Sequence, residues 1–135
     1  MIDELSNMLD DNEIYAMKKI FFEQAYERIT ELKNLLLQLK DGIDNETILH
    51  TMMRHFHTLG GDSAVINLTY VSTLARKAEE LLTKVINKQI SVNLATIELL
   101  DYCIDTVDSL LHTSEKNTSD LANWAKIYKK NESCT

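Results

Sequence analysis

The stretch DDNEIYAMKKIFFEQAYERITELKNLLLQLKDG, residues 10–42, decides the fold class. Its apolar residues recur every three or four positions, which is the spacing of one face of an α-helix. These residues are Ile14, Met17, Phe21, Ala25, Ile29, Leu32, Leu36 and Leu39. Asp10 and Asp11 can cap the start of the helix, and Gly42 can cap its end. The stretch therefore predicts one long amphipathic helix.

The same spacing continues along most of the chain. Asp44 or Asn45 would cap a second helix, a break near residues 67–69 would separate it from a third, and Ser91 would cap a fourth. The residues expected to face inward are Leu49, Met52, Phe56, Leu59 and Ser63 in the second helix, Val71, Leu74, Ala78, Leu81 and Val85 in the third, and Leu94, Ile97, Leu100, Ile104, Val107 and Leu111 in the fourth.

The two ends of the chain carry weaker patterns. The polar run at residues 112–119 is expected to be a loop, and a short last helix would follow it. The apolar side of this last helix would be formed by Leu121, Trp124, Ala125 and Tyr128. Near the start, Ile2, Leu5 and Leu9 have helical spacing and could form a short amphipathic helix.

Composition agrees with an all-helical chain. The 135 residues include no proline, and only three are glycine. Four long helices with short connections predict an all-α fold, namely an antiparallel four-helix bundle with one or two additional short terminal helices. We expect residues 1–135 to form a single domain, because a chain of this length typically makes one.

Net charge and cysteine content limit the classes of function. The formal net charge of −7 argues against a nucleic-acid-binding protein, which needs a basic face. No segment reaches the length of about 20 apolar residues that crosses a membrane. Cys103 lies in an apolar helical stretch and Cys134 in the polar tail, so no disulfide framework is expected. These features predict a cytoplasmic protein that binds neither nucleic acid nor membrane.

His57 is the leading candidate for a functional residue. It lies one helical step from the core residue Phe56, so its ring would sit on the flank of the second helix. Gly60 and Gly61 follow at i+3 and i+4, where they would line the surface beside the ring. Glycine inside a helix costs about 1 kcal/mol relative to alanine, so two together suggest that space beside His57 is needed.

The third helix offers a carboxylate for this histidine. Glu79 lies one step past the core residue Ala78, so it is also on a flank. If the second and third helices are neighbours, Glu79 could accept a hydrogen bond from one ring nitrogen of His57. Such a bond fixes the tautomer and makes the other nitrogen more nucleophilic. The alternative is that His57 is a surface residue without a task.

Metal chemistry is poorly supported by the other histidines. His55 and His57 are two residues apart and face different ways on a helix, so they are poor co-ligands. A di-iron bundle needs repeated Glu-x-x-His pairs, whereas Glu46 and His50 are four apart and unrepeated. We read His50 as a surface residue and expect no metal and no cofactor in this chain.

The segment HTLGGDSA at residues 57–64 resembles the signature of histidine-containing phosphotransfer (HPt) domains, which is a histidine, two residues, a lysine, a glycine and then small residues. Three further features resemble the chemotaxis-kinase type of this family, namely Arg54, FFEQA at residues 21–25 and EELL at residues 79–82. The resemblance runs from about residue 14 to residue 88. In that type of domain, a glutamate at this distance hydrogen-bonds the histidine ring.

Two positions depart from the family pattern. Gly60 stands where the family has the lysine that helps to hold the phosphoryl group, so a positive charge is missing. Arg76 or Lys77, from the third helix, could compensate for it. Asn67 stands near the end of the segment, where the family often has a glycine.

The resemblance implies a phosphoryl carrier in a two-component phosphorelay. His57 would take the phosphoryl group from a histidine kinase or a phosphorylated receiver and pass it to an aspartate on the receiver domain of a response regulator. Glu79, Gly60, Gly61 and Arg54 would support it. The receiver would bring the Mg²⁺. The chain has no phosphate-binding glycine loop or kinase motif, so it is not expected to be an enzyme by itself. We expect a monomer. The alternative is a degenerate HPt-like module that binds a receiver or kinase without transfer.

Overall fold

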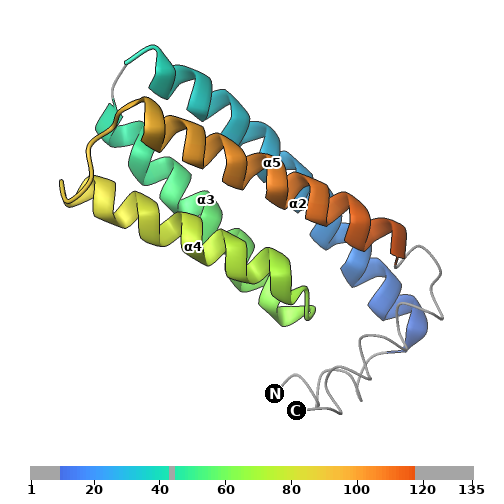
Figure 1. Ribbon diagram of the computed structural model, residues 1–135. Helices are drawn as coiled ribbons and strands as arrows, with labels where there is room; N and C mark the ends of the chain where they lie inside the picture. The colour runs from blue at the N-terminus through green and yellow to red at the C-terminus, as the bar shows by residue number, and fades with distance from the viewer. Residues whose placement is uncertain (1–9, 43–44, 118–135) are drawn as a thin grey trace.

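The described part of the chain forms four helices that pack side by side. The computed structural model describes residues 10–42 and 45–117, and its helices are α2 (Asp11–Lys40), α3 (Asn45–Val65), α4 (Thr69–Ile86) and α5 (Leu94–Asn117). Helix α2 packs against α3 and α5, and α4 packs against the same two helices, so the four close into a ring (Figure 1). Consecutive helices run in opposite directions, and the predicted antiparallel bundle is confirmed.

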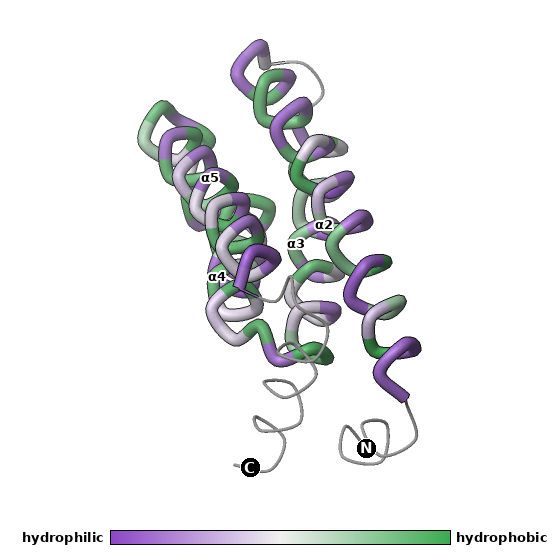
Figure 2. The backbone as a smooth tube through the Cα atoms, turned by 90° about the vertical axis from the view of Figure 1, so that its right-hand side faces the viewer, coloured by the Kyte–Doolittle hydropathy of each residue, from purple (hydrophilic) through white to green (hydrophobic). Residues whose placement is uncertain are grey.

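The apolar face of every helix turns toward the centre of this ring. Figure 2 shows hydrophobic and hydrophilic residues alternating along each helix, as expected for amphipathic helices around a common core. The largest fully buried side chains come from all four helices and are Ile14, Phe22, Leu32, Leu39, Met52, Phe56, Leu59, Leu82, Leu100, Ile104 and Leu111. Full burial of an aliphatic or aromatic side chain contributes about 1.5–3 kcal/mol, so this core dominates the stability of the bundle.

Helix α2 begins and ends where the sequence predicts. The Asp10 side chain accepts a hydrogen bond from the backbone N–H of Glu13 at 2.8 Å, and the Glu13 side chain accepts from the backbone N–H of Asp10 at 3.4 Å. This reciprocal pair is a capping box. At the other end, Gly42 follows the last cap residue with a φ of 75°, a conformation that glycine adopts without steric cost.

Helix α3 ends in a tight turn at Asn67. This residue has a φ of 63°, and the next backbone N–H, that of Leu68, donates to the carbonyl of Ser63 at 2.9 Å. The pattern is a Schellman motif, in which glycine is the usual residue and asparagine the next most suitable. Asn67 therefore takes the left-handed position itself, and the helix break predicted near residues 67–69 is confirmed.

The predicted core of α4 is partly wrong. Leu74 and Leu81 are only half buried, and Ala75 and Leu82, one residue further along, are completely buried instead. Because α4 contacts both α3 and α5, its buried face is wider than a single stripe. Ala78 remains at the centre of that face.

Helix α5 starts later and ends later than predicted. Ser91 is not its cap: the Asn93 side chain accepts a hydrogen bond from the backbone N–H of Thr96 at 3.0 Å, and the helix starts at Leu94. Leu94 is the first helical residue, at the end of the bundle, and it is 71% exposed rather than inside. At the other end, the helix continues through Asn117, so residues 112–117 are not a loop.

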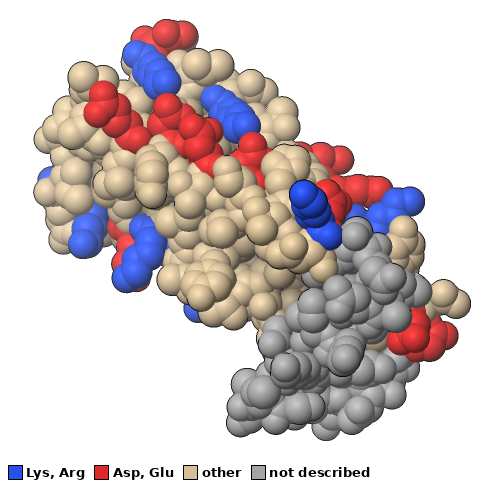
Figure 3. Space-filling view, turned by 45° about the vertical axis from the view of Figure 1, so that its right-hand side comes forward, with Lys and Arg blue, Asp and Glu red and all other residues tan. Residues whose placement is uncertain are grey.

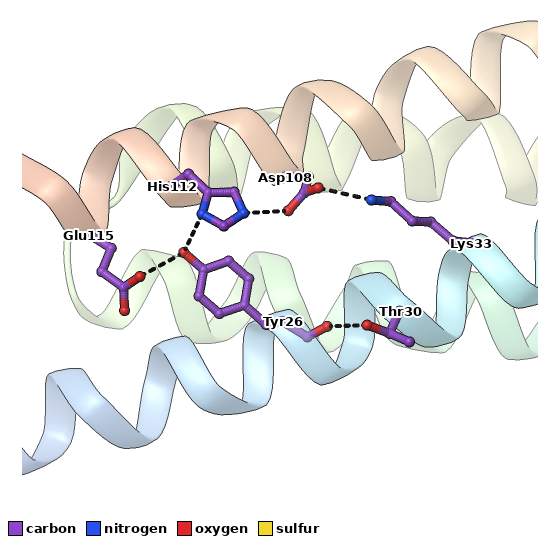
Figure 4. A network of polar contacts seen from close by, with 6 residues as sticks. All are labelled: Tyr26, Thr30, Lys33, Asp108, His112 and Glu115. Carbon is purple, nitrogen blue, oxygen red and sulfur yellow. Dashed lines mark hydrogen bonds and ion pairs between the residues drawn. The ribbon is translucent and has the colours of Figure 1, made fainter.

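A polar network between α2 and α5 accounts for the longer end of α5. The His112 ring stacks on Tyr26 with 4.7 Å between centroids, and the Tyr26 hydroxyl donates to Glu115 at 2.9 Å (Figure 4). One turn back along α5, Asp108 lies 3.3 Å from Nε2 of His112 and 2.9 Å from the Lys33 amine. Burial and the carboxylate of Glu115 raise the pKa of Tyr26, so its hydroxyl keeps its proton. These contacts fix the last two turns of α5 against α2.

Some expectations lie outside the described residues. They are the short helix through Ile2, Leu5 and Leu9, the cap at Asp44, the last helix with Leu121, Trp124, Ala125 and Tyr128, and the surroundings of Cys134. Cys103 is buried as expected, and burial raises the pKa of its thiol. None of the four described helices is long and apolar enough to cross a lipid bilayer.

The Tyr26 network generates a test of stability. We expect Tyr26→Phe to lower the free energy of unfolding by about 0.5–1.5 kcal/mol, because it removes one hydroxyl that donates to a carboxylate. Tyr102→Phe is the matched control, since Tyr102 lies on α5 and is 65% exposed. Urea unfolding followed by circular dichroism measures both variants. Equal stability of the two variants would contradict a structural role for the network.

Candidate functional site

His57 lies on the outer surface of α3, beside α4. Its neighbour Phe56 is completely buried, whereas the His57 side chain is 76% exposed. The flank position predicted for this ring is confirmed, and the ring is more open than a boundary position requires. From residue 50 onward, the exposed residues of α3 follow one line at helical spacing, which consists of His50, Arg54, His57, Gly61 and Val65. We call this line the α3 stripe.

The predicted hydrogen bond between His57 and Glu79 is present. The distance between His57 Nδ1 and Glu79 Oε2 is 2.6 Å, and the Glu79 side chain is 26% exposed. A carboxylate can only accept, so the ring donates through an Nδ1–H. In the neutral ring this leaves the lone pair on Nε2, and the ring is open to solvent on that side. The arrangement fixes one tautomer and presents a nucleophilic nitrogen to an approaching molecule.

Helix α4 holds Glu79 in place through its next turn. The Thr83 hydroxyl contacts the backbone carbonyl of Glu79 at 2.9 Å and the sulfur of Met53 at 3.5 Å. Met53 lies one turn before His57 on α3, so this contact joins the two helices beside the His57–Glu79 pair. The sequence alone gave no reason to expect a role for Thr83.

The sequence predicted that Gly60 lines the open surface beside His57, and this prediction is wrong. Gly60 is buried against α4, and a Cβ atom placed on it would lie 3.3 Å from Arg76 Cγ and 3.6 Å from Ala75 Cβ. Its carbonyl accepts a hydrogen bond from the buried Ser72 hydroxyl at 2.9 Å. The missing side chain therefore serves the close approach of two helices.

Gly61 does line the open surface. A Cβ atom on Gly61 would meet nothing within 4 Å, and the residue is exposed one turn beyond His57. The prediction of free space beside the ring is thus confirmed for Gly61 and wrong for Gly60. The difference arises because adjacent helical residues point about 100° apart, so only one of them can face α4.

Arg54 belongs to the α3 stripe but turns away from His57. Its guanidinium donates to the Thr51 hydroxyl at 3.3 Å, one turn back along the helix. It also lies close enough to His55 to contribute, after burial and Arg28, to the lowered pKa of that histidine. Arg54 is exposed, so its charge faces any molecule that covers the stripe.

His55 and His112 lie apart from this site, whereas His50 belongs to the α3 stripe. His55 points toward α2, where its ring nitrogens lie 3.3 Å from Arg28 and 3.7 Å from Glu31. His55 and His57 therefore face different ways, as predicted. Within the described ranges, no three histidine, cysteine, aspartate or glutamate side chains come together in a group that could hold a metal ion.

The His57 site is a surface rather than a pocket. A hollow of about 490 Å³ lies at the end of the bundle, lined by Asn45, Leu49, Val85, Ile90 and Val92, and His57 is not part of it. Figure 3 shows one face of the molecule as a whole, on which acidic side chains form a band with basic side chains near it. An open imidazole on a helix face suits reaction with a group that another macromolecule presents.

Comparison with known proteins matches this arrangement to one family. A family model described as Hpt domain matches residues 16–112. The chain is 24% identical over 109 residues to a chemotaxis protein CheA of Treponema pallidum, which covers 81% of this chain. It is 25% identical over 121 residues to a chemotaxis protein CheA of Listeria monocytogenes and 24% identical over 122 residues to a sensor histidine kinase CheAY of Helicobacter pylori, each covering 90% of this chain.

These relatives are much longer than the region they share with this chain. The matched regions span 13%, 18% and 14% of the proteins from T. pallidum, L. monocytogenes and H. pylori, respectively. No solved structure matches the chain significantly.

The two glycines should respond differently to the same substitution. We expect Gly61→Ala to raise the free energy of unfolding by about 0.5–1 kcal/mol, because alanine is the better helix former and meets no neighbour there. Gly60→Ala should gain clearly less, because its methyl group must displace the Arg76 side chain. Urea unfolding of the two variants checks this order, and an equal gain at both positions would show that Gly60 is not tightly packed.

Glu79 should control the tautomer of His57. When the His57 ring is neutral, we expect ¹⁵N chemical shifts that assign its proton to Nδ1. In Glu79→Ala the Nε2–H tautomer, which free imidazole side chains prefer in water, should become the major one. Glu80→Ala is the matched control, because Glu80 is the exposed neighbour on the same helix and pairs with Lys77. An unchanged tautomer in Glu79→Ala would mean that the hydrogen bond does not orient the ring.

Proposed function

The chain belongs to the Hpt domain family, and from that premise we propose that it carries a phosphoryl group on Nε2 of His57. The observation that supports this proposal most directly is the pairing of His57 with Glu79. Nδ1 is held at 2.6 Å from the Glu79 carboxylate, and the side chain is 76% exposed. A ring fixed on one side and open on the other is suited to a nucleophile that meets its substrate on another protein.

In the first half-reaction, the Nε2 lone pair attacks the phosphorus of the donor. The Nε2–P bond forms, the bond between phosphorus and the donor's leaving group breaks, and the leaving group keeps that electron pair. The phosphorylated ring keeps its Nδ1–H and becomes positively charged. The Glu79 carboxylate stabilises this charge and needs no proton transfer, because it already accepts a hydrogen bond from Nδ1–H.

In the second half-reaction, a carboxylate oxygen of an aspartate on a receiver domain attacks the same phosphorus. The P–Nε2 bond breaks, and its electron pair returns to the ring. Phosphoryl transfer depends on positioning and charge neutralisation, and in this proposal the receiver brings Mg²⁺ for that purpose. The chain itself acts as a carrier rather than as a kinase.

The α3 stripe is the docking surface in this proposal. Arg54 supplies a positive charge one turn before His57, and Gly61 leaves open space one turn beyond it. Val65, at the end of the stripe, is 44% exposed and adds apolar area.

In this proposal the phosphoryl donor is a histidine kinase or a phosphorylated receiver, and the protein acts in the cytoplasm. The alternative function, binding without transfer, shares this docking surface.

Labelling with a phosphorylated receiver tests the proposal. We expect radioactive phosphate to move from the receiver to the wild-type protein, in a bond that is labile to acid and stable to base. His57→Gln should abolish the label, because it removes the imidazole that supplies the nucleophilic nitrogen in the His57–Glu79 pair. His112→Gln, which changes an exposed histidine on α5, away from the α3 stripe, should leave labelling unchanged.

The outcomes separate the two functions. Labelling of His57→Gln at the wild-type level would show that another residue accepts the phosphoryl group. Tight binding of the receiver without any labelling of the wild-type protein would favour the binding module.

A further inference from the structure

The facing positions of α3 and α4 follow a regular register around His57. Met53 contacts Thr83, His57 contacts Glu79, and Gly60 faces Arg76. Each step moves up α3 by three or four residues and down α4 by the same number. Arg76 therefore lies one turn from Glu79 on α4, directly across from the residue that is one turn beyond His57.

The side chain of Arg76 occupies the space that a side chain at position 60 would need. Its Cγ lies 3.3 Å from where a Gly60 Cβ would be. Arg76 is exposed, and its Cγ lies beside Gly60, so its guanidinium lies beyond that contact. On a helix, Cβ atoms three residues apart lie about 5–6 Å from each other, a span that the atoms of arginine beyond Cγ can bridge. The guanidinium is thus within reach of a group on Nε2 of His57.

The charge of Arg76 is available for such a group. Within the described residues, Arg76 makes no ion pair or hydrogen bond, whereas its neighbour Lys77 lies 3.8 Å from Glu80. The guanidinium is planar and matches two phosphoryl oxygens at once. A dianionic group on the ring would lie beside the negative charge of Glu79, which is 2.6 Å from Nδ1.

We propose that Arg76 holds the phosphoryl group on His57 from the opposite helix, in place of the lysine that resembling domains carry at the position of Gly60. This inference rests on the proposed function and adds a specific positioning residue to it. Gly60 and Arg76 form one unit, because a side chain at position 60 would force the arginine side chain to shift.

Phosphoramidate, a small phosphoryl donor, tests the inference without a receiver. The Nε2 lone pair attacks its phosphorus, the P–N bond breaks, and ammonia leaves. We expect Arg76→Ala to slow the labelling of His57 about two- to fivefold, the effect of losing one exposed charge contact. Arg76→Lys should keep most of the rate. Lys77→Ala is the matched control, since it removes an adjacent exposed cation, and it should react like the wild type.

A charge transplant makes the test specific. In the double variant Gly60→Lys/Arg76→Ala, the new lysine finds the space that the arginine left, and the rate should recover toward that of the wild type. Added to the wild type, Gly60→Lys should give little gain, because both side chains compete for that space. At about 1 M salt, where charges more than about 3 Å apart are screened, the gap between wild type and Arg76→Ala should narrow.

The failures are distinguishable. A wild-type protein that neither phosphoramidate nor a phosphorylated receiver labels would overturn the proposed function and this inference with it. Where only the receiver labels the wild type, the same variants are compared with the receiver as donor. Normal labelling of the wild type together with an equal rate in Arg76→Ala would overturn the inference and leave the proposed function in place. A slow Arg76→Ala that neither salt nor the transplanted lysine affects would show a structural role only.

Discussion

The close approach of α3 and α4 across Gly60 is the constraint on which the site depends. The Ser72 hydroxyl donates to the Gly60 carbonyl at 2.9 Å, and Ala75 and Ala78 complete a buried α4 surface with small side chains. Small residues let two helix backbones come near each other. That proximity fixes the register of facing pairs, and the register puts Glu79 within 2.6 Å of His57. A wider spacing between these helices would leave the carboxylate too far to orient the ring.

This constraint also explains why one side of the imidazole is held by the protein while the other side is open to solvent. The core holds the back of each helix, so the imidazole and its carboxylate partner are positioned by helices that are themselves fixed by buried side chains. The front of the ring faces solvent on a surface without a pocket. Such a site can present a nucleophile and stabilise the charged ring, but it surrounds the reacting phosphorus on one side only. The proposed receiver must therefore provide the other side of the transition state.

The sequence predicted most of the fold because the helical period is strong and long. It predicted that Glu79 could accept a hydrogen bond from His57 if the second and third helices are neighbours, and both the packing and the bond are observed. It failed where tertiary contacts override local patterns. Residues 112–117 look like a polar loop, but His112 and Glu115 reach Tyr26 on α2, a contact that no local pattern encodes. The predicted start of α5 was wrong for a smaller reason. Both Ser91 and Asn93 are residue types that cap helices, and it is the Asn93 side chain that accepts the hydrogen bond from the Thr96 N–H.

The glycine pair shows why residue type alone cannot assign a role. Both glycines follow His57 by about one turn, and the sequence treats them alike, yet one is buried between helices and the other is open to solvent. Position 60 can hold either a cationic side chain of its own or the side chain of Arg76 lying across it. The two arrangements compete for the same space, because a Cβ on Gly60 would lie only 3.3 Å from Arg76 Cγ. In the proposed arrangement, glycine at this position leaves room for Arg76 from α4, which would supply the positive charge that a lysine at position 60 would otherwise bring.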